Sequence, residues 1–91
     1  MNRARFRIPD RSPDRPKVPA VRALVENYYA KPENGAGGCC HIVLDDCNLK
    51  DADVRWTLEN CEKSGDGDGA EIMRLMLQMT SSQRRRVVRR S

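Results

Sequence analysis

Proline is distributed very unevenly along this chain, and its distribution limits where a folded domain can lie. Four of the five prolines fall within residues 1–19, where the tripeptide Pro-Asp-Arg occurs at positions 9–11 and again at 13–15. Proline breaks helix interiors, and a segment so poor in large apolar residues cannot fill a core. We therefore expect residues 1–19 to form an extended, disordered basic arm and residues 20–91 to form one small folded domain.

Charge is also segregated along the chain. Residues 1–22 hold seven basic residues and two aspartates, and residues 84–91 hold five arginines and no acidic residue, so each segment has a net charge of +5. Residues 23–83 hold five basic and eleven acidic residues, which gives a net charge of −6. An acidic body with two basic extensions is suited to contact a polyanion or an acidic protein surface, or to fold back on itself.

Beyond the arm, apolar residues recur at the spacing of amphipathic helices. The first stripe predicts a helix that ends near Ala30, because Pro32 and a glycine-rich loop follow. A second helix should begin near Asp51 and end at Ser64 and Gly65, and a third should follow Asp66. The three stripes are Val21, Leu24, Val25 and Tyr28; Val54, Leu58 and Cys61; and Ile72, Leu75, Met76 and Met79.

Two shorter segments complete the predicted fold. Residues 39–46 form an apolar run that fits either a buried strand or a short helix, and we favour helix because a lone strand would leave its backbone groups unpaired. Thr80 to Gln83 match a capping box, which predicts a separate arginine-rich helix over 84–90. The predicted fold class is all-α: a small bundle of four to five short helices behind an extended basic N-terminal arm.

A set of residues between Val21 and Val88 carries a family resemblance. It consists of Tyr28-Tyr29, Asn34, Gly37-Gly38, His41 to Asp46, Asn48, Asp53, Gly65-Asp66, Gly69, Leu75 to Leu77, Met79-Thr80 and Gln83-Arg84. In these residues the chain resembles a family of small uncharacterised proteins encoded by bacteriophages and prophages. Where the relatives have glycine, this chain has Cys47. The resemblance implies a phage accessory context and no particular mechanism.

The cysteines and the single histidine are the first candidates for a metal site. Zinc ligands usually occur in pairs two to four residues apart, whereas Cys39, Cys40 and His41 are adjacent and should project in divergent directions. Cys61 lies on a core stripe, where a free thiol behaves as a small apolar group. We therefore expect no metal and no cofactor, and rank last a zinc site built from Cys39, Cys40, His41 and Cys47.

His41 and Asp45 are four residues apart, so a helix would place both on one face, where Asp46 and Asp53 could join them. A histidine beside a carboxylate and a thiol has the components of a nucleophilic catalyst, but each component is common, and we expect no enzyme. Two interpretations stay open: a hydrogen-bond cluster that anchors the double-glycine loop, or a surface that grips a partner. The candidate partner-binding residues are His41, Asp45, Asp46 and Asp53.

The C-terminal arginines indicate a second kind of partner. On a helix they would form a cationic face, and guanidinium groups bind phosphate through two hydrogen bonds at once. Binding through such a face would read the nucleic-acid backbone and not the bases. The candidate nucleic-acid-binding residues are Arg84, Arg85, Arg86, Arg89 and Arg90.

These features give one leading hypothesis and two alternatives. The leading one is a phage accessory protein that binds a host protein or protein–nucleic-acid complex stoichiometrically, with inhibition of a host defence system, as by an anti-CRISPR protein, as one form. The alternatives are a nucleic-acid-binding protein and a small zinc-binding protein. Because no apolar run approaches the length of a membrane span or a signal peptide, we expect no membrane partner, reduced cysteines and a place in the bacterial cytoplasm.

Overall fold

A computed structural model describes residues 15–88, and in that range the protein is all-α, as the sequence predicts. Five α-helices and two short 3-10 helices follow one another, and the described residues contain no strand. Residues 39–44 are helical, as favoured above for the 39–46 segment, and Asp45 and Asp46 form a turn after it. The elements are α1 (Val18–Ala30), η1 (Pro32–Asn34), η2 (Gly38–Cys40), α2 (His41–Leu44), α3 (Asp51–Ser64), α4 (Gly67–Leu77) and α5 (Ser81–Val88).

The boundary between arm and domain differs slightly from the expected one. Helix α1 begins at Val18, ahead of Pro19, because proline is tolerated in the first turn, where its missing N–H would have no partner. The side chain of Val18 is buried, so the last residues of the predicted arm belong to the folded domain. Most of that arm, residues 1–14, lies outside the described residues, as do residues 89–91.

Local signals set most of the helix ends. Helix α1 ends at Ala30 as predicted, and Gly65 ends α3 in the left-handed conformation at φ 78°. The Asp66 carboxylate caps α4 by accepting a hydrogen bond from the Gly69 N–H at 3.0 Å. Ahead of α5, the predicted capping box is present: the Gln83 N–H donates to Thr80 Oγ1 at 3.1 Å, and the Thr80 N–H donates to Gln83 Oε1 at 3.0 Å.

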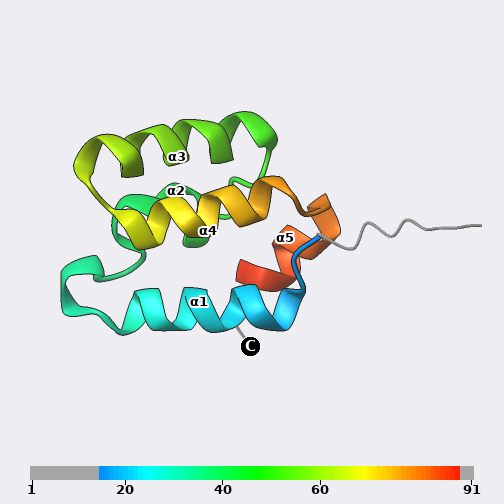
Figure 1. Ribbon diagram of the computed structural model, residues 1–91, viewed down its shortest axis with the longest axis horizontal. Helices are drawn as coiled ribbons and strands as arrows, with labels where there is room; N and C mark the ends of the chain where they lie inside the picture. Colours follow the sequence, from blue (N-terminus) through cyan, green and yellow to red (C-terminus); the bar gives the residue numbers. More distant parts are fainter. Residues whose placement is uncertain (1–14, 89–91) are drawn as a thin grey trace, which may run out of the picture.

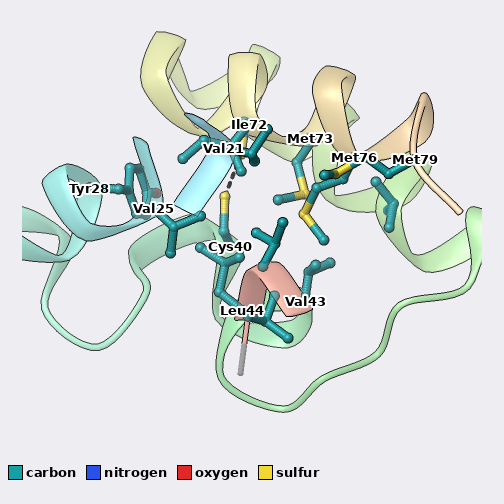
Figure 2. Close-up of a cluster of buried hydrophobic side chains, with 14 of the residues drawn as sticks. Val21, Val25, Tyr28, Cys40, Val43, Leu44, Ile72, Met73, Met76 and Met79 are labelled. Atoms are coloured by element: carbon teal, nitrogen blue, oxygen red, sulfur yellow. Dashed lines mark hydrogen bonds between the residues drawn. The ribbon is translucent and has the colours of Figure 1, made fainter. Parts of the chain in front are cut away.

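Helix α4 lies at the centre of the domain, between α3 on one side and α1 on the other, and α5 packs against α1 (Figure 1). Side chains from all of these elements meet in one core. Met73 and Met76 of α4 are fully buried there, and Val21, Val25 and Tyr28 of α1 belong to the same core, where Val21 lies beside Ile72 of α4 (Figure 2). The segment η2–α2 contributes Cys40, Val43 and Leu44 to the same core, as Figure 2 shows.

Two polar side chains are buried among the apolar ones, those of Thr57 and Arg84. Thr57 is 0% exposed, and within the described part of the chain its Oγ1 is the buried side-chain atom that lacks a hydrogen-bond partner. The guanidinium of Arg84, in contrast, has a partner at each of its three nitrogens, as described below.

Between residues 15 and 88, no helix combines the length and the apolar character that crossing a bilayer requires.

Candidate functional site

A surface groove of about 810 Å³ runs between the start of α3, the loop before it and α5. The loop contributes its residues from Cys47 to Lys50, α3 contributes Asp53, and α5 contributes residues from both of its turns. The lining residues are Cys47, Asn48, Leu49, Lys50, Asp53, Ser81, Ser82, Arg85, Arg86 and Val88.

Arg84 fixes the position of α5 along this groove. Its side chain is 4% exposed, and it donates from Nε to the carbonyl oxygen of Met76 and from Nη1 to that of Leu49, each at 2.7 Å. Its Nη2 lies 2.6 Å from Oδ1 of Asp51. A single guanidinium thus holds α5 against both the end of α4 and the loop that forms the opposite wall. Since this group is buried and each of its three nitrogens has a partner inside the protein, we assign Arg84 to the fold and remove it from the predicted phosphate-binding set.

The remaining charges give the groove a positive character. Arg85 and Arg86 are exposed and line it, and Lys50 is exposed on the opposite wall. Asp53, which is half-buried, is the one acidic residue in the lining. Arg89 and Arg90, predicted to extend the cationic face, lie outside the described residues.

Trp56 stands one helical turn after Asp53, on the same flank of α3. It is the large apolar side chain that the described surface exposes, with 54% of its area open to solvent. The groove therefore combines two arginines and a lysine with an aromatic side chain on the adjoining flank. Tryptophan and arginine are the residues most enriched where protein interfaces concentrate their binding energy.

The four residues predicted to bind a partner do not form one cluster. His41 is exposed, and its Nδ1 lies 3.3 Å from the carbonyl oxygen of Gly38. Asp45 accepts a hydrogen bond from the Tyr29 hydroxyl at 2.6 Å and lies against Gly37, where a Cβ atom would come within 2.7 Å of its Oδ2. Asp45 thus ties the end of α2 to α1 and packs closely against the double-glycine loop, and its role in binding a partner stays a prediction.

Of that predicted set, Asp46 is exposed at the end of α2, and Asp53 alone lines the groove. The predicted zinc residues are also separated. Cys39, His41 and Cys47 are exposed, and Cys47 adopts a left-handed conformation at φ 60°. A positive φ of this kind favours glycine over a residue with a side chain.

Cys40 is instead buried against Cys61, with the two Sγ atoms 3.5 Å apart. The dashed line at the Cys40 sulfur in Figure 2 marks a hydrogen bond of this cluster. Asp66 completes the group, since one ligand atom of each of the three residues lies within 4.8 Å of the others. The Tyr28 hydroxyl donates a hydrogen bond to the Asp66 carboxylate. Four distant segments thus meet in one buried polar cluster, which we call the thiol–carboxylate cluster: Tyr28, Cys40, Cys61 and Asp66.

Burial and these contacts change how the cluster titrates. Burial raises the pKa of Tyr28 far above its ordinary value, and the hydrogen bond to Asp66 raises it further. The hydrogen bond between the thiols lowers the pKa of Cys40, with burial acting in the opposite direction. The same hydrogen bond, together with burial, raises the pKa of Cys61.

Sequence patterns missed the groove and the composition of the cluster. The signal for Trp56 was available, because it stands off the apolar stripe of its helix. For the cluster no local signal exists, since Tyr28 and Cys40 are distant in sequence from Cys61 and Asp66 and reach them only through tertiary packing. Comparisons with protein-family models, with curated proteins and with solved structures find no match to this chain.

Proposed function

We propose that this protein acts by stoichiometric binding to a host macromolecule, and that the groove between the 47–53 segment and α5 is the contact surface. One observation carries the proposal: Lys50, Arg85 and Arg86 stand exposed along one groove, with a single carboxylate among them. Charges held on two rigid walls can match a fixed pattern of negative charge on a partner.

A host protein with an acidic surface is the partner that the groove favours. Trp56 supports this choice, because an exposed indole on the flank of the groove can enter an apolar pocket while the arginines pair with carboxylates around it. The resemblance to phage-encoded proteins supports a host factor as the target, with a component of a defence system as one form. Binding would then block or redirect that factor without any bond being made or broken.

Nucleic acid is the second candidate, and the start of α5 favours it. Ser81 and Ser82 in its first turn line the groove together with Arg85 and Arg86. Hydroxyl groups, guanidinium groups and the positive end of a helix are all suited to phosphate oxygens. Contacts of this kind follow the backbone, so this candidate implies binding without sequence preference.

Affinity capture from host lysate tests the proposal when it is run with matched variants of the full chain. The groove variant is Arg85→Ala/Arg86→Ala, and a second variant is Trp56→Ala. The control is Arg22→Ala/Arg74→Ala, which removes the same charge from two exposed arginines outside the groove lining. We expect the wild type and the control to retain the same host protein, and the groove variant to retain at least tenfold less of it.

Nuclease treatment and salt separate the two candidates. A protein partner should stay bound after nuclease treatment, and Trp56→Ala should weaken its retention. A nucleic-acid partner should be lost after that treatment, and its affinity should fall by about 0.9 log units per neutralised phosphate for each log unit of salt. Equal retention by the groove variant and the control would remove the groove from the proposal, and capture of no specific partner would count against stoichiometric binding itself.

A further inference from the structure

The thiol–carboxylate cluster includes Cys61 in the last turn of α3, whereas the groove lies at the start of that helix, and the cluster takes no part in the proposed binding function. It joins a 3-10 helix, the last turn of α3 and the cap of α4. Cys40 and Cys61 are each 0% exposed, and Asp66 is half-buried. Two thiols and a carboxylate thus share a small volume inside a domain whose core is otherwise almost wholly apolar.

We propose that Cys40, Cys61 and Asp66 hold a zinc-type divalent cation through two thiolate sulfurs and one carboxylate oxygen. Zinc accepts both sulfur and oxygen ligands, whereas calcium and magnesium take oxygen ligands almost exclusively. Three protein ligands with a fourth position open to a further group is a common zinc arrangement. The Tyr28 hydroxyl, already bonded to Asp66, and a water molecule are the candidates for that position.

The spacing of the sulfurs fits ligation better than it fits a disulfide. Two sulfurs that each bind one tetrahedral zinc ion at about 2.3 Å lie about 3.8 Å apart. Cys40 Sγ and Cys61 Sγ are 3.5 Å apart, so they need to separate only slightly to hold an ion. A disulfide bond requires them to approach to about 2.05 Å, a larger movement inside a packed core.

The charge balance at Asp66 points the same way. Its carboxylate accepts hydrogen bonds from the Gly69 N–H and the Tyr28 hydroxyl. None of the ion pairs among residues 15–88 includes it, since the nearby Lys31 pairs with Asp68 instead. A cation between this carboxylate and the two sulfurs would supply the positive charge that a half-buried carboxylate otherwise lacks.

The backbone is shaped around these donors at two glycines. A Cβ atom on Gly69 would lie 2.6 Å from Oδ2 of Asp66 and 2.9 Å from Sγ of Cys61. A Cβ atom on Gly38 would lie 2.8 Å from the Tyr28 hydroxyl oxygen. Both glycines therefore allow main chain to approach the donors more closely than any side chain would permit, which encloses the site from two directions.

An access route reaches the site from solvent. A surface cleft of about 420 Å³ is lined by Gly38, Gly65 and Asp66, so the carboxylate forms part of its wall. Cys39 also lines this cleft, with its exposed sulfur 3.4 Å from the Ser64 hydroxyl. An ion can therefore reach the Asp66 carboxylate from solvent, whereas the two thiols are 0% exposed and do not line the cleft.

Cobalt titration of the reduced, metal-free full chain tests this site, because cobalt occupies zinc sites and reports sulfur ligands by charge-transfer absorption. We expect one cobalt ion per chain, a charge-transfer band, and its displacement by one equivalent of zinc. Cys40→Ser and Cys61→Ser should each abolish the band, and Asp66→Asn should weaken binding at least tenfold. The matched control, Cys39→Ser/Cys47→Ser, removes both exposed thiols and should bind as the wild type does.

Thermal unfolding with and without zinc supplies a second measurement, because an ion that binds only the folded state raises the unfolding temperature. The wild type and the Cys39→Ser/Cys47→Ser control should gain stability with zinc, and a Cys40→Ser chain that remains helical by circular dichroism should not. The proposal is overturned if the wild type shows no charge-transfer band, or if the band is lost only when the exposed thiols are removed. It is also overturned if zinc does not change the unfolding temperature of the reduced chain while mild oxidation forms a disulfide between Cys40 and Cys61.

Discussion

The guanidinium of Arg84 donates to the carbonyl oxygen of Leu49 at 2.7 Å, across 35 positions of sequence. The same group donates to the Met76 carbonyl and pairs with Asp51, so it joins three parts of the chain that helix formation alone would leave independent. The wall of the groove that carries Arg85 and Arg86 is held in place by this contact.

Replacing Arg84 should therefore destabilise the whole domain. Arg84→Met keeps an aliphatic side chain of similar length but removes the donor to the Leu49 carbonyl and one of the donors to the Met76 carbonyl, which still accepts from the Met79 N–H. Because hydrogen bonds from charged donors contribute about 1.5–3 kcal/mol each, we expect the free energy of unfolding to fall by about 2–4 kcal/mol in urea titrations. Arg85→Met, on an exposed neighbour, should change it by less than about 0.5 kcal/mol. Equal effects at the two positions would contradict this role.

The role of Arg84 was partly readable from the sequence. Arg84, Val87 and Val88 are spaced i, i+3 and i+4, and these are the buried residues of α5. Because Arg84 belongs to a run of arginines, the sequence pattern assigned it to the cationic face and not to this buried stripe. The helices themselves were predicted well because stripes, caps and prolines act locally, as at Ala30, Gly65 and Thr80.

The thiol–carboxylate cluster could not be predicted from sequence patterns. Cys40 and Cys61 are 21 positions apart, and Tyr28 and Asp66 are 38 apart. No periodicity links residues that belong to different helices, since their approach depends on how α1, η2, α3 and α4 pack. Ligand spacing compares only neighbours in sequence, so it does not detect residues that meet through packing. Cys61 lies in the core, as its apolar stripe predicts.

Thr57 offers a test of the core. Its hydroxyl is buried without a hydrogen-bond partner, so folding removes its hydrogen bonds to water and forms no other hydrogen bond in their place. Thr57→Val replaces that hydroxyl with a methyl group of similar size, and we expect the free energy of unfolding to rise by about 1–2 kcal/mol. Thr80→Val is the opposite case, because Thr80 Oγ1 accepts from the Gln83 N–H and its loss should destabilise by about 1 kcal/mol. A loss of stability in Thr57→Val would show that the hydroxyl has a partner.

Gly37 tests the anchoring of the double-glycine loop. Gly37 and Gly65 both have positive φ, at 93° and 78°, but an added Cβ meets Asp45 at the first and open space at the second. Gly65→Ala should lower the free energy of unfolding by about 1–2 kcal/mol through backbone strain alone. Gly37→Ala should lower it by at least about 1 kcal/mol more, because Asp45 must move away from its Tyr29 contact. Chemical denaturation of the two variants decides this, and equal losses would contradict it.

Cys47 tests whether the left-handed backbone at the groove is strained. Its φ is 60°, and a side chain there costs about 1–2 kcal/mol relative to an ordinary conformation. Cys47→Gly should therefore stabilise the folded chain by about 0.5–1 kcal/mol, after the greater freedom of glycine in the unfolded chain is counted. Cys39→Gly makes the same change at an exposed cysteine without positive φ and should destabilise by about 0.5–1 kcal/mol. Thermal unfolding shifts of the same sign for both variants would disprove this reading.

The hydroxyl of Tyr28 should make the metal-free protein sensitive to alkali. Its pKa is raised by burial and by its hydrogen bond to Asp66, so the folded state favours the neutral phenol. A raised pKa contributes stability that is fully present below the unfolded value of 10.0 and is lost as the pH rises above it. We expect the free energy of unfolding to fall above pH 10 by up to about 1.4 kcal/mol per pH unit from this group.

Urea unfolding at a series of pH values, in wild type and in Tyr28→Phe, isolates this contribution. The variant loses the hydrogen bond to Asp66, so it should be less stable than the wild type at pH 8, and the difference between the two should shrink above pH 10. Because the Tyr28 hydroxyl also lowers the pKa of Cys40, the same comparison is repeated in a Cys40→Ser background, where that thiol does not titrate. A difference that stays constant from pH 8 to pH 11 would mean that Tyr28 ionises as readily in the folded chain as in the unfolded one, and that its hydroxyl is not held in the cluster as described.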